Sequence, residues 1–342
     1  MGSALAVAVD PLDRGHLLLG TDSGLLGSRN GGRDWELLAP DLLVGAVLAV
    51  SFDATGRTLL AASASTLAAS EDAAGWRSRL MPIGGSPPRA LVRDTRAASF
   101  YLLGWNGLFH TDDAGATWSS LSAGLPGPVV RLLVTAQGEG SLLAIAGGDL
   151  WSSRDGGRIW EERSGNLPRG QLEALAIDVD SPNHVWAGGA SRAFESQNSG
   201  RTWTTVGRQL PDAGVRIHDI VPQLGGDTNG LIISTDRGLY LTRDAGATWD
   251  LLQDNLPGHI QAGPLLQDGR RPTTLYAGFS VTPYEEVWQN AALGSSALAR
   301  LGGSELAGAA AFLILLGLGA GAALRSLARR SRAAGISRGL AG

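Results

Sequence analysis

Short runs of apolar residues, separated by glycine-rich turns, recur along roughly the first 290 residues of the chain. In one period the runs cover residues 89–93, 100–104 and 107–111, and a fourth begins at Thr117. Equivalent second and third runs lie at 17–21 and 24–28, 142–146 and 149–153, 185–189 and 193–196, and 231–235 and 238–242. Four short strands in each period of about 42 residues predict one antiparallel sheet per period, and an all-β domain.

The seventh period is less regular than the others. It has apolar runs at 260–266 and 274–279, but the turn after them has decayed to the sequence at 282–288, which ends in Trp288. Seven periods predict a closed array of seven sheets over residues 1–290. How the seventh sheet closes the array is left open, because the first period is complete in its own sequence.

An eight-residue turn sequence separates the third strand of a period from the fourth. It is clearest at 242–249 and 111–118, looser at 28–35, 153–160 and 196–203, and one residue shorter at 70–76. Its third position is acidic or an amide: Asn30, Asp72, Asp113, Asp155, Asn198 and Asp244. Its last position is always tryptophan: Trp35, Trp76, Trp118, Trp160, Trp203 and Trp249, spaced 41 to 46 residues apart. Such a period indicates a repeat architecture.

The residue types in this turn predict a structural role. A first-position Ser or Thr ends the incoming strand, and the Asp or Asn is expected to accept hydrogen bonds from amides two or three residues further on. The fifth position is Gly in five copies, which suits a backbone with positive φ. The tryptophan is expected to bury its ring and anchor the hairpin.

These residues resemble the Asp-box or BNR repeat of sialidase-like β-propellers. The resemblance implies a seven-bladed β-propeller with its boxes on the outer hairpins, away from the usual binding face. Among such propellers, the chain is most similar to the photosystem II stability and assembly factor family, whose members bind assembling membrane proteins and are not enzymes. Nothing in the sequence indicates photosynthesis.

The character of the chain changes after Trp288. Residues 291–304 read as a linker, 305–325 as one C-terminal transmembrane α-helix and 326–342 as a basic tail. The 19 residues 306–324 carry no charge, and at 1.5 Å per residue they reach about 28 Å, close to the hydrocarbon thickness of a membrane. A helix packed on the propeller is the alternative, because the segment is rich in Gly and Ala.

The basic tail also predicts an orientation. Five arginines follow the uncharged segment, so the positive-inside rule places the C-terminus in the cytoplasm and the propeller outside it. Such a single-pass protein needs an export signal, yet residues 1–9 have no basic region before their apolar run. Either the true start lies upstream, or the C-terminal helix directs export.

Charge and composition exclude several functions. Five of the 28 basic residues lie after the last acidic one, Glu305, so residues 1–305 carry 23 basic and 32 acidic groups, a net charge of −9. Nucleic-acid binding is therefore not expected, since phosphate contacts need clustered positive charge. The chain has no cysteine and five scattered histidines, so neither a metal site nor a cofactor site is expected.

Catalytic residues are also not expected. The Arg-Ile-Pro signature of sialidases is missing, and Tyr284, beside Glu285 and Glu286, is the one tyrosine predicted to lie in a loop. A glycoside hydrolase of sialidase-like fold stays the alternative, because two carboxylates at a suitable separation would suffice. Asp22, Asp149 and Asp236 are expected at equivalent positions in the turns between second and third strands, where an Asp before Gly more often serves the turn.

Basic residues gather where the first strand begins in the third to seventh periods. In a propeller these entrances surround the mouth of a central channel. The residues are Arg89, Arg131, Arg169, Arg216, His218 and His259. Together they predict a locally positive site for an acidic segment of a protein partner. The leading hypothesis is a membrane-anchored, non-catalytic β-propeller that binds protein partners and assists the assembly or stability of membrane or extracytoplasmic complexes.

Overall fold

The computed structural model describes residues 4–73, 75–84, 86–135, 140–178, 181–212, 214–222, 230–252, 261–268 and 271–280. The chain divides into two units, Met1–Ala292 and Leu293–Gly342. The predicted linker, transmembrane helix and basic tail lie outside the described residues. Within the described part of the chain, no helix is long and apolar enough to cross a membrane.

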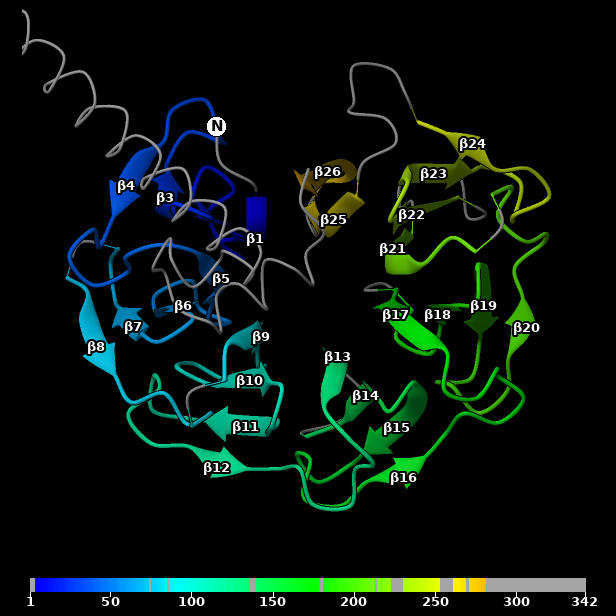
Figure 1. The fold of residues 1–342 in the computed structure, drawn as a ribbon, viewed down its shortest axis with the longest axis horizontal. Coiled ribbons are helices and arrows are strands. Elements are labelled where there is room, and N and C mark those ends of the chain that lie inside the picture. The colour runs from blue at the N-terminus through cyan, green and yellow to red at the C-terminus, as the bar shows by residue number, and fades with distance from the viewer. Residues whose placement is uncertain are drawn as a thin grey trace, which may run out of the picture. The chain divides into compact units, whose positions relative to one another are not determined.

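Six four-stranded antiparallel sheets follow one another in sequence order (Figure 1), which confirms the predicted all-β class. The first three sheets are β1–β4 (Ala4–Val9, Leu17–Thr21, Gly24–Ser28, Glu36–Leu38), β5–β8 (Val47–Phe52, Leu59–Ser63, Leu67–Ser70, Arg77–Arg79) and β9–β12 (Pro88–Arg93, Phe100–Gly104, Gly107–Thr111, Ser119–Ser120). The next three are β13–β16 (Val129–Val134, Leu142–Ala146, Asp149–Ser153, Glu161–Glu162), β17–β20 (Leu172–Ile177, Val185–Gly189, Arg192–Ser196, Thr204–Thr205) and β21–β24 (Ile217–Pro222, Leu231–Thr235, Gly238–Thr242, Asp250–Leu251).

A two-stranded sheet, β25 (Gln261–Asp268) and β26 (Arg271–Ser280), follows the sixth. Its strands are longer than the apolar runs at 260–266 and 274–279 suggested. The first strands of successive sheets lie side by side, and β25 lies beside both β21 and β1 (Figure 1). Apolar side chains of adjacent sheets pack together, as where Trp186 and Ala174 of the fifth sheet meet Ile217 of the sixth. The core is therefore a series of layers between sheets.

The turn after each third strand is closed by its own side chains. In the sixth sheet, the Thr242 hydroxyl donates to Asp244 Oδ1 at 2.8 Å and accepts the Gly246 N–H at 2.8 Å. Asp244 accepts the backbone N–H of Thr248 at 2.9 Å and its hydroxyl at 2.7 Å. Six third strands end at a Ser or Thr of this kind. The turn thus satisfies its polar groups locally.

The acceptor reaches further along the turn than the sequence suggested. Asn30 Oδ1 accepts the N–H groups of Arg33 and Asp34, three and four residues on, so the expectation of two or three was wrong by one residue. The reason is that two consecutive residues have positive φ. In the sixth turn these are Ala245 (54°) and Gly246 (80°). A second left-handed residue widens the loop, and the amides that face the acceptor move one position along.

The tryptophans are not equally buried. Trp203 is 3% exposed, but Trp35 is 38% exposed, so the expected anchoring by a buried ring was wrong for Trp35. The segment leading out of the preceding sheet covers the later tryptophans. The indole N–H of Trp160 donates to Leu121 O and that of Trp249 to Arg208 O, both at 3.0 Å. The indole N–H of Trp35 donates instead to Gly32 O of its own turn, at 3.0 Å.

The hydrogen bonds of the turn predict a dependence of stability on acid. The backbone N–H and hydroxyl of Thr248 lower the pKa of Asp244 to about 2, from a usual value of 3.8. Because this pKa is lowered on folding, ionised Asp244 stabilises the folded state. This stabilisation is fully present above about pH 4 and is lost as the pH falls through about 2. We expect the melting temperature to fall between pH 5 and pH 2, and to fall less in Asp244→Asn.

The fifth sheet supplies the reason for choosing asparagine. Asn198 Oδ1 accepts the Thr202 N–H at 2.9 Å, and Asn198 Nδ2 donates to the Thr202 hydroxyl at 2.7 Å. An amide therefore keeps both contacts with the hydroxyl reversed, and carries no titrating charge. Differential scanning calorimetry of both proteins at matched ionic strength tests this. An identical acid dependence of the two melting temperatures would contradict it.

Candidate binding site at the inner-strand entrances

Each of the first strands β1, β5, β9, β13, β17 and β21 carries one extra residue near its beginning. The pairing register with the second strand shifts there, for example between Leu172 and Ala174 and between Ile217 and Asp219. The extra residues are Leu5, Leu48, Arg89, Val130, Glu173 and His218. A β-bulge re-aims side chains and leaves local backbone groups unpaired. The strand entrances are therefore distinct from the regular sheet that follows.

Three of the predicted basic residues come together at the entrances of β13 and β21. Arg131 Nη2 lies 3.3 Å from Asp219 Oδ2, and the same nitrogen donates to the carbonyl of His218. Arg216 binds Glu173 with Nε and Nη2, at 3.1 and 2.9 Å from Oε1. His218 Nδ1 lies 3.9 Å from Glu173 Oε2. These five residues form the entrance cluster.

The entrance cluster has mixed charge, which the sequence did not suggest. Each arginine faces a carboxylate, from Asp219 or Glu173, so the basic side chains are paired with acids. The two acids occupy β17 and β21, strands that are otherwise mainly apolar. A charged residue inside a short apolar run is uncommon unless it is paired, and this signal could have identified both from the sequence.

Burial sets the protonation of the cluster. Burial, together with the charges of Arg216 and Arg131, lowers the pKa of His218 to about 4, so His218 is neutral at pH 7. Burial also raises the pKa of Asp219, while the Arg131 charge and the N–H of Leu265 act against that rise. Asp219 Oδ2 accepts that N–H at 3.3 Å. Asp219 thus links β21 to β25, and Arg131 compensates its buried charge.

The other predicted residues have different surroundings. The Arg89 guanidinium lies 4.2 Å from the centre of the Trp105 ring, a cation–π arrangement. Arg169 contacts Glu162 and lies 4.0 Å from Asp149 Oδ1. His259 lies outside the described residues. Asp22 and Asp236 are the first residues after β2 and β22, whereas Asp149 is the third residue after β14 and begins β15. The expectation that the three carboxylates hold equivalent positions was therefore wrong for Asp149, by two residues.

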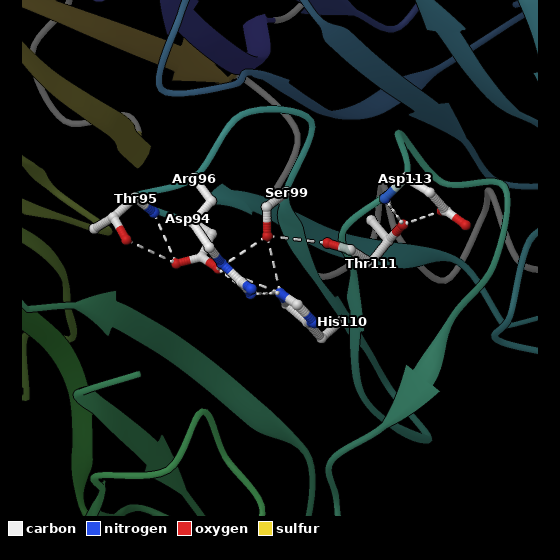
Figure 2. A network of polar contacts seen from close by, with 7 residues as sticks. All are labelled: Asp94, Thr95, Arg96, Ser99, His110, Thr111 and Asp113. Carbon is white, nitrogen blue, oxygen red and sulfur yellow. Dashed lines mark hydrogen bonds and ion pairs between the residues drawn. The ribbon is translucent and has the colours of Figure 1, made fainter. Parts of the chain in front are cut away.

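A second polar network contains the residue types of a nucleophilic triad (Figure 2). Ser99 Oγ lies 2.9 Å from Asp94 Oδ2 and 3.0 Å from His110 Nε2. Asp94 Oδ2 lies 3.3 Å from the same His110 nitrogen. A triad needs the acid and the nucleophile on opposite ring nitrogens, with the hydroxyl open to substrate. Here both contact one nitrogen and Ser99 is fully buried, so this arrangement does not suit nucleophilic catalysis.

The network instead joins a loop to a turn. Asp94 accepts the backbone N–H of Thr95 at 2.7 Å and the Arg96 side chain at 3.0 Å. Burial by itself raises the pKa of Asp94, but the hydrogen bonds of His110, Thr95, Ser99 and Arg96 outweigh burial and hold that pKa well below its usual range. Ser99 Oγ also lies 3.1 Å from the carbonyl of Thr111, where the turn begins. Asp94 is thus a buried anion that ties the β9–β10 loop to β11.

Among the described residues, no group of three or more His, Cys, Asp or Glu could hold a metal ion. Tyr284, Glu285 and Glu286 lie outside those residues.

The sequence matches no protein-family model and no curated protein. Solved structures do resemble the chain. A structure of YCF48 bound to D1 peptide is 20% identical, with a TM-score of 0.61, and covers 82% of this chain and 91% of its own. YCF48 from Cyanidioschyzon merolae is 17% identical, with a TM-score of 0.62, and covers 82% and 93%. The extracellular domain of BT4673 from B. thetaiotaomicron is 12% identical, with a TM-score of 0.62, and covers 81% and 37%. At these identities the likeness establishes the fold, a β-propeller.

Proposed function

We propose that this chain is a membrane-anchored, non-catalytic β-propeller that binds a protein partner at its inner-strand entrances. The entrance cluster is the observation that carries the proposal. The side chains of Arg216, Glu173 and Arg131 are 57%, 34% and 32% exposed, while their backbones belong to or adjoin bulged strands of a rigid sheet. A partner segment with its own acidic groups could pair with the arginines, and the pre-ordered side chains would lose little entropy on binding.

The comparison with YCF48 supports a protein as the partner. One of the similar structures is YCF48 bound to D1 peptide, so a propeller of this fold does bind a peptide. By analogy, this chain would assist the assembly or stability of a membrane or extracytoplasmic complex. The Ser99, His110 and Asp94 geometry gives no support to the alternative of a hydrolase.

The partner site can be tested with Arg216→Glu. The substitution reverses one exposed charge, and the fold should tolerate it because exposed ion pairs contribute little stability. Arg131 is a poorer choice, since Arg131→Glu would place a carboxylate against the buried Asp219. In pull-downs from native membranes, we expect Arg216→Glu to capture roughly tenfold less of the wild-type partner, about 1.4 kcal/mol of binding free energy.

The matched control is Arg33→Glu, which reverses an exposed arginine in the turn of the first sheet, away from the entrance cluster. This variant should capture the same proteins as wild type. Equal capture by wild type, Arg33→Glu and folded Arg216→Glu would exclude the entrance cluster as the binding site.

We further propose that β25 and β26 belong to a seventh blade. The supporting observations are that β25 lies beside both β21 and β1, and that Asp219 of β21 accepts the N–H of Leu265 in β25. The outer strands of this blade would come from the chain after Ser280 or from residues preceding Met1.

The membrane anchor follows from residues 305–325 and is tested separately. We expect carbonate-washed membranes to retain the full chain, since about 28 Å of uncharged helix matches the hydrocarbon core. A chain ending at Gly303 should be recovered in the soluble fraction. A reporter fused after Gly342 should be active in the cytoplasm, as the arginines that follow the segment require. Release of the full chain by carbonate would contradict the anchor, and a reporter active only outside the cytoplasm would contradict the orientation.

A further inference from the structure

The residue that follows the first strand of a sheet is Asp in four of the first five sheets. These residues are Asp10, Asp53, Asp94 and Asp178, and the fourth sheet has Thr135 instead. In the second sheet the Asp53 carboxylate bridges to the next sheet. Its Oδ1 accepts the N–H groups of Thr55 and Arg57, both at 3.1 Å, and its Oδ2 accepts the Ala98 N–H of the third sheet at 2.8 Å. At that junction, a protein carboxylate occupies the space between two sheets.

Thr135 does not make this bridge. Its N–H and hydroxyl donate to Ser141 O, within its own loop, at 2.8 and 3.2 Å. A groove of about 520 Å³ lies between the fourth and fifth sheets, and Thr135 forms part of its lining. Asn183 lines the opposite wall, two residues before β18, just as Ala98 stands two residues before β10. The groove therefore has, between the fourth and fifth sheets, the position that the Asp53 bridge has between the second and third sheets.

The groove has an unusual charge. Arg154, Arg163 and Arg201 line it, and the lining contains no Asp or Glu among the described residues. Arg163 is held in place, because its Nε donates to Ser152 Oγ and its Nη2 to Glu161 Oε2, both at 3.1 Å. Among the described residues, the lining offers no carboxylate to the guanidinium groups of Arg154 and Arg201, which favours an anion there. The planar guanidinium fits a carboxylate with two parallel hydrogen bonds.

Two of these arginines differ from Arg163 in their contacts. Among the described residues, neither the Arg154 nor the Arg201 guanidinium makes a hydrogen bond or an ion pair. Arg29 holds the same position in the first turn as Arg154 in the fourth, but the Arg29 guanidinium does have a protein partner. Its Nη2 donates to the carbonyl of Asp72 in the next sheet, at 2.9 Å. At the fourth sheet, the equivalent cation is thus available to a ligand.

We propose that the groove between the fourth and fifth sheets binds a small polycarboxylate, one of whose carboxylates takes the place that the Asp53 carboxylate has between the second and third sheets. Two carboxylates would match the guanidinium groups of Arg154 and Arg201. The remaining lining is largely hydroxyl and amide, with Leu142 and Leu143 as its apolar part, so a hydroxylated acid suits it best. The volume is within the range of small-molecule sites, roughly 300–1,000 Å³. This site is independent of the entrance cluster, because it lies at the opposite end of β13.

Calorimetric titration of the full chain with citrate, at constant ionic strength and pH 7, tests the proposal. We expect saturable binding of citrate, and binding at least about tenfold weaker for acetate, sulfate and inorganic phosphate, since each additional paired carboxylate adds binding free energy. Absence of citrate binding would overturn the proposal. Equal binding of sulfate or phosphate would overturn the assignment to carboxylates, and binding of a polyglutamate peptide without citrate binding would mean that the site takes a protein segment.

Two variants locate the site. Thr135→Asp supplies the carboxylate from the protein itself, as in the second sheet, and should abolish citrate binding while the melting temperature is kept. Thr135→Ser, its neutral control, should bind as wild type. Should Thr135→Asp not fold, Arg154→Gln/Arg201→Gln should weaken binding at least about tenfold. The control Arg158→Gln, an exposed arginine of the fourth turn that does not line the groove, should not. Undiminished binding by a folded Thr135→Asp or by the Arg154→Gln/Arg201→Gln variant would place citrate elsewhere.

Discussion

Replacing Trp203 by alanine is expected to lower the free energy of unfolding by about 4 kcal/mol, whereas the same change at Trp35 should cost about 1 kcal/mol. The two residues hold the same position in their turns and make the same local hydrogen bond. The Trp203 indole N–H donates to Gly200 O at 3.1 Å, and that of Trp35 to Gly32 O at 3.0 Å. They differ in burial, because the exposed fraction is 3% for Trp203 and 38% for Trp35.

The reason for the larger loss is the packing between sheets. Trp203 belongs to an apolar cluster with Leu143 and Leu150 of the fourth sheet and Leu167 of the segment between the two sheets. Truncation would leave a cavity there that the surrounding strands cannot close. Urea unfolding followed by circular dichroism measures both losses. Equal losses for the two variants would mean that the local hydrogen bond, and not burial between sheets, gives the tryptophan its effect.

Gly246→Ala should lower the free energy of unfolding by about 3 kcal/mol, and Gly31→Ala by about 1 kcal/mol. Both glycines have positive φ, 80° and 73°, so both substitutions strain the backbone to a similar extent. They differ in the space around the new methyl group. A Cβ at Gly246 would lie 2.8 Å from Val206 O and 3.0 Å from Val206 C, whereas a Cβ at Gly31 would meet nothing within 4 Å.

The crowding at Gly246 comes from the neighbouring segment. The chain leaving the fifth sheet crosses this turn, where the Arg208 N–H donates to Gly246 O at 2.8 Å. A methyl group would force that segment away and break this contact between sheets. Gly31 has a natural comparison, since Ala114 and Ala245 hold the equivalent position in other turns. Urea unfolding of both variants measures the difference, and a loss at Gly31→Ala as large as that at Gly246→Ala would contradict this explanation.

Much of the fold could be predicted because its signals are local. The second and third strands of five periods were expected within one residue of their observed bounds, as at Phe100–Gly104 and Gly107–Thr111. The apolar runs are short and end at turn residues, so few alternative boundaries exist. The fourth strands were less predictable. The one expected from Thr117 begins at Ser119, because these outer strands are exposed and carry little apolar pattern.

The binding site was only partly predictable. Basic residues at the strand entrances were recognised from their positions, but Glu173 and Asp219, which pair with them, were not. The bulges at Glu173 and His218 shift the strand register by one residue where these side chains pair. Such a shift leaves no mark in a pattern of apolar and polar residues, because it moves side chains without changing their order.

The sequence by itself determined the features whose partners lie within about ten residues. A turn such as 242–249 closes with its own hydroxyl, carboxylate and glycine, so its residue types are sufficient to define it. Tertiary structure decided the features that join residues about 40 or more positions apart. These include the burial of Trp203 but not Trp35, the pairing of Arg131 with Asp219, and the groove left where Thr135 replaces the bridging carboxylate. Each depends on how neighbouring sheets pack, and packing is a property of surfaces that meet only in the folded chain.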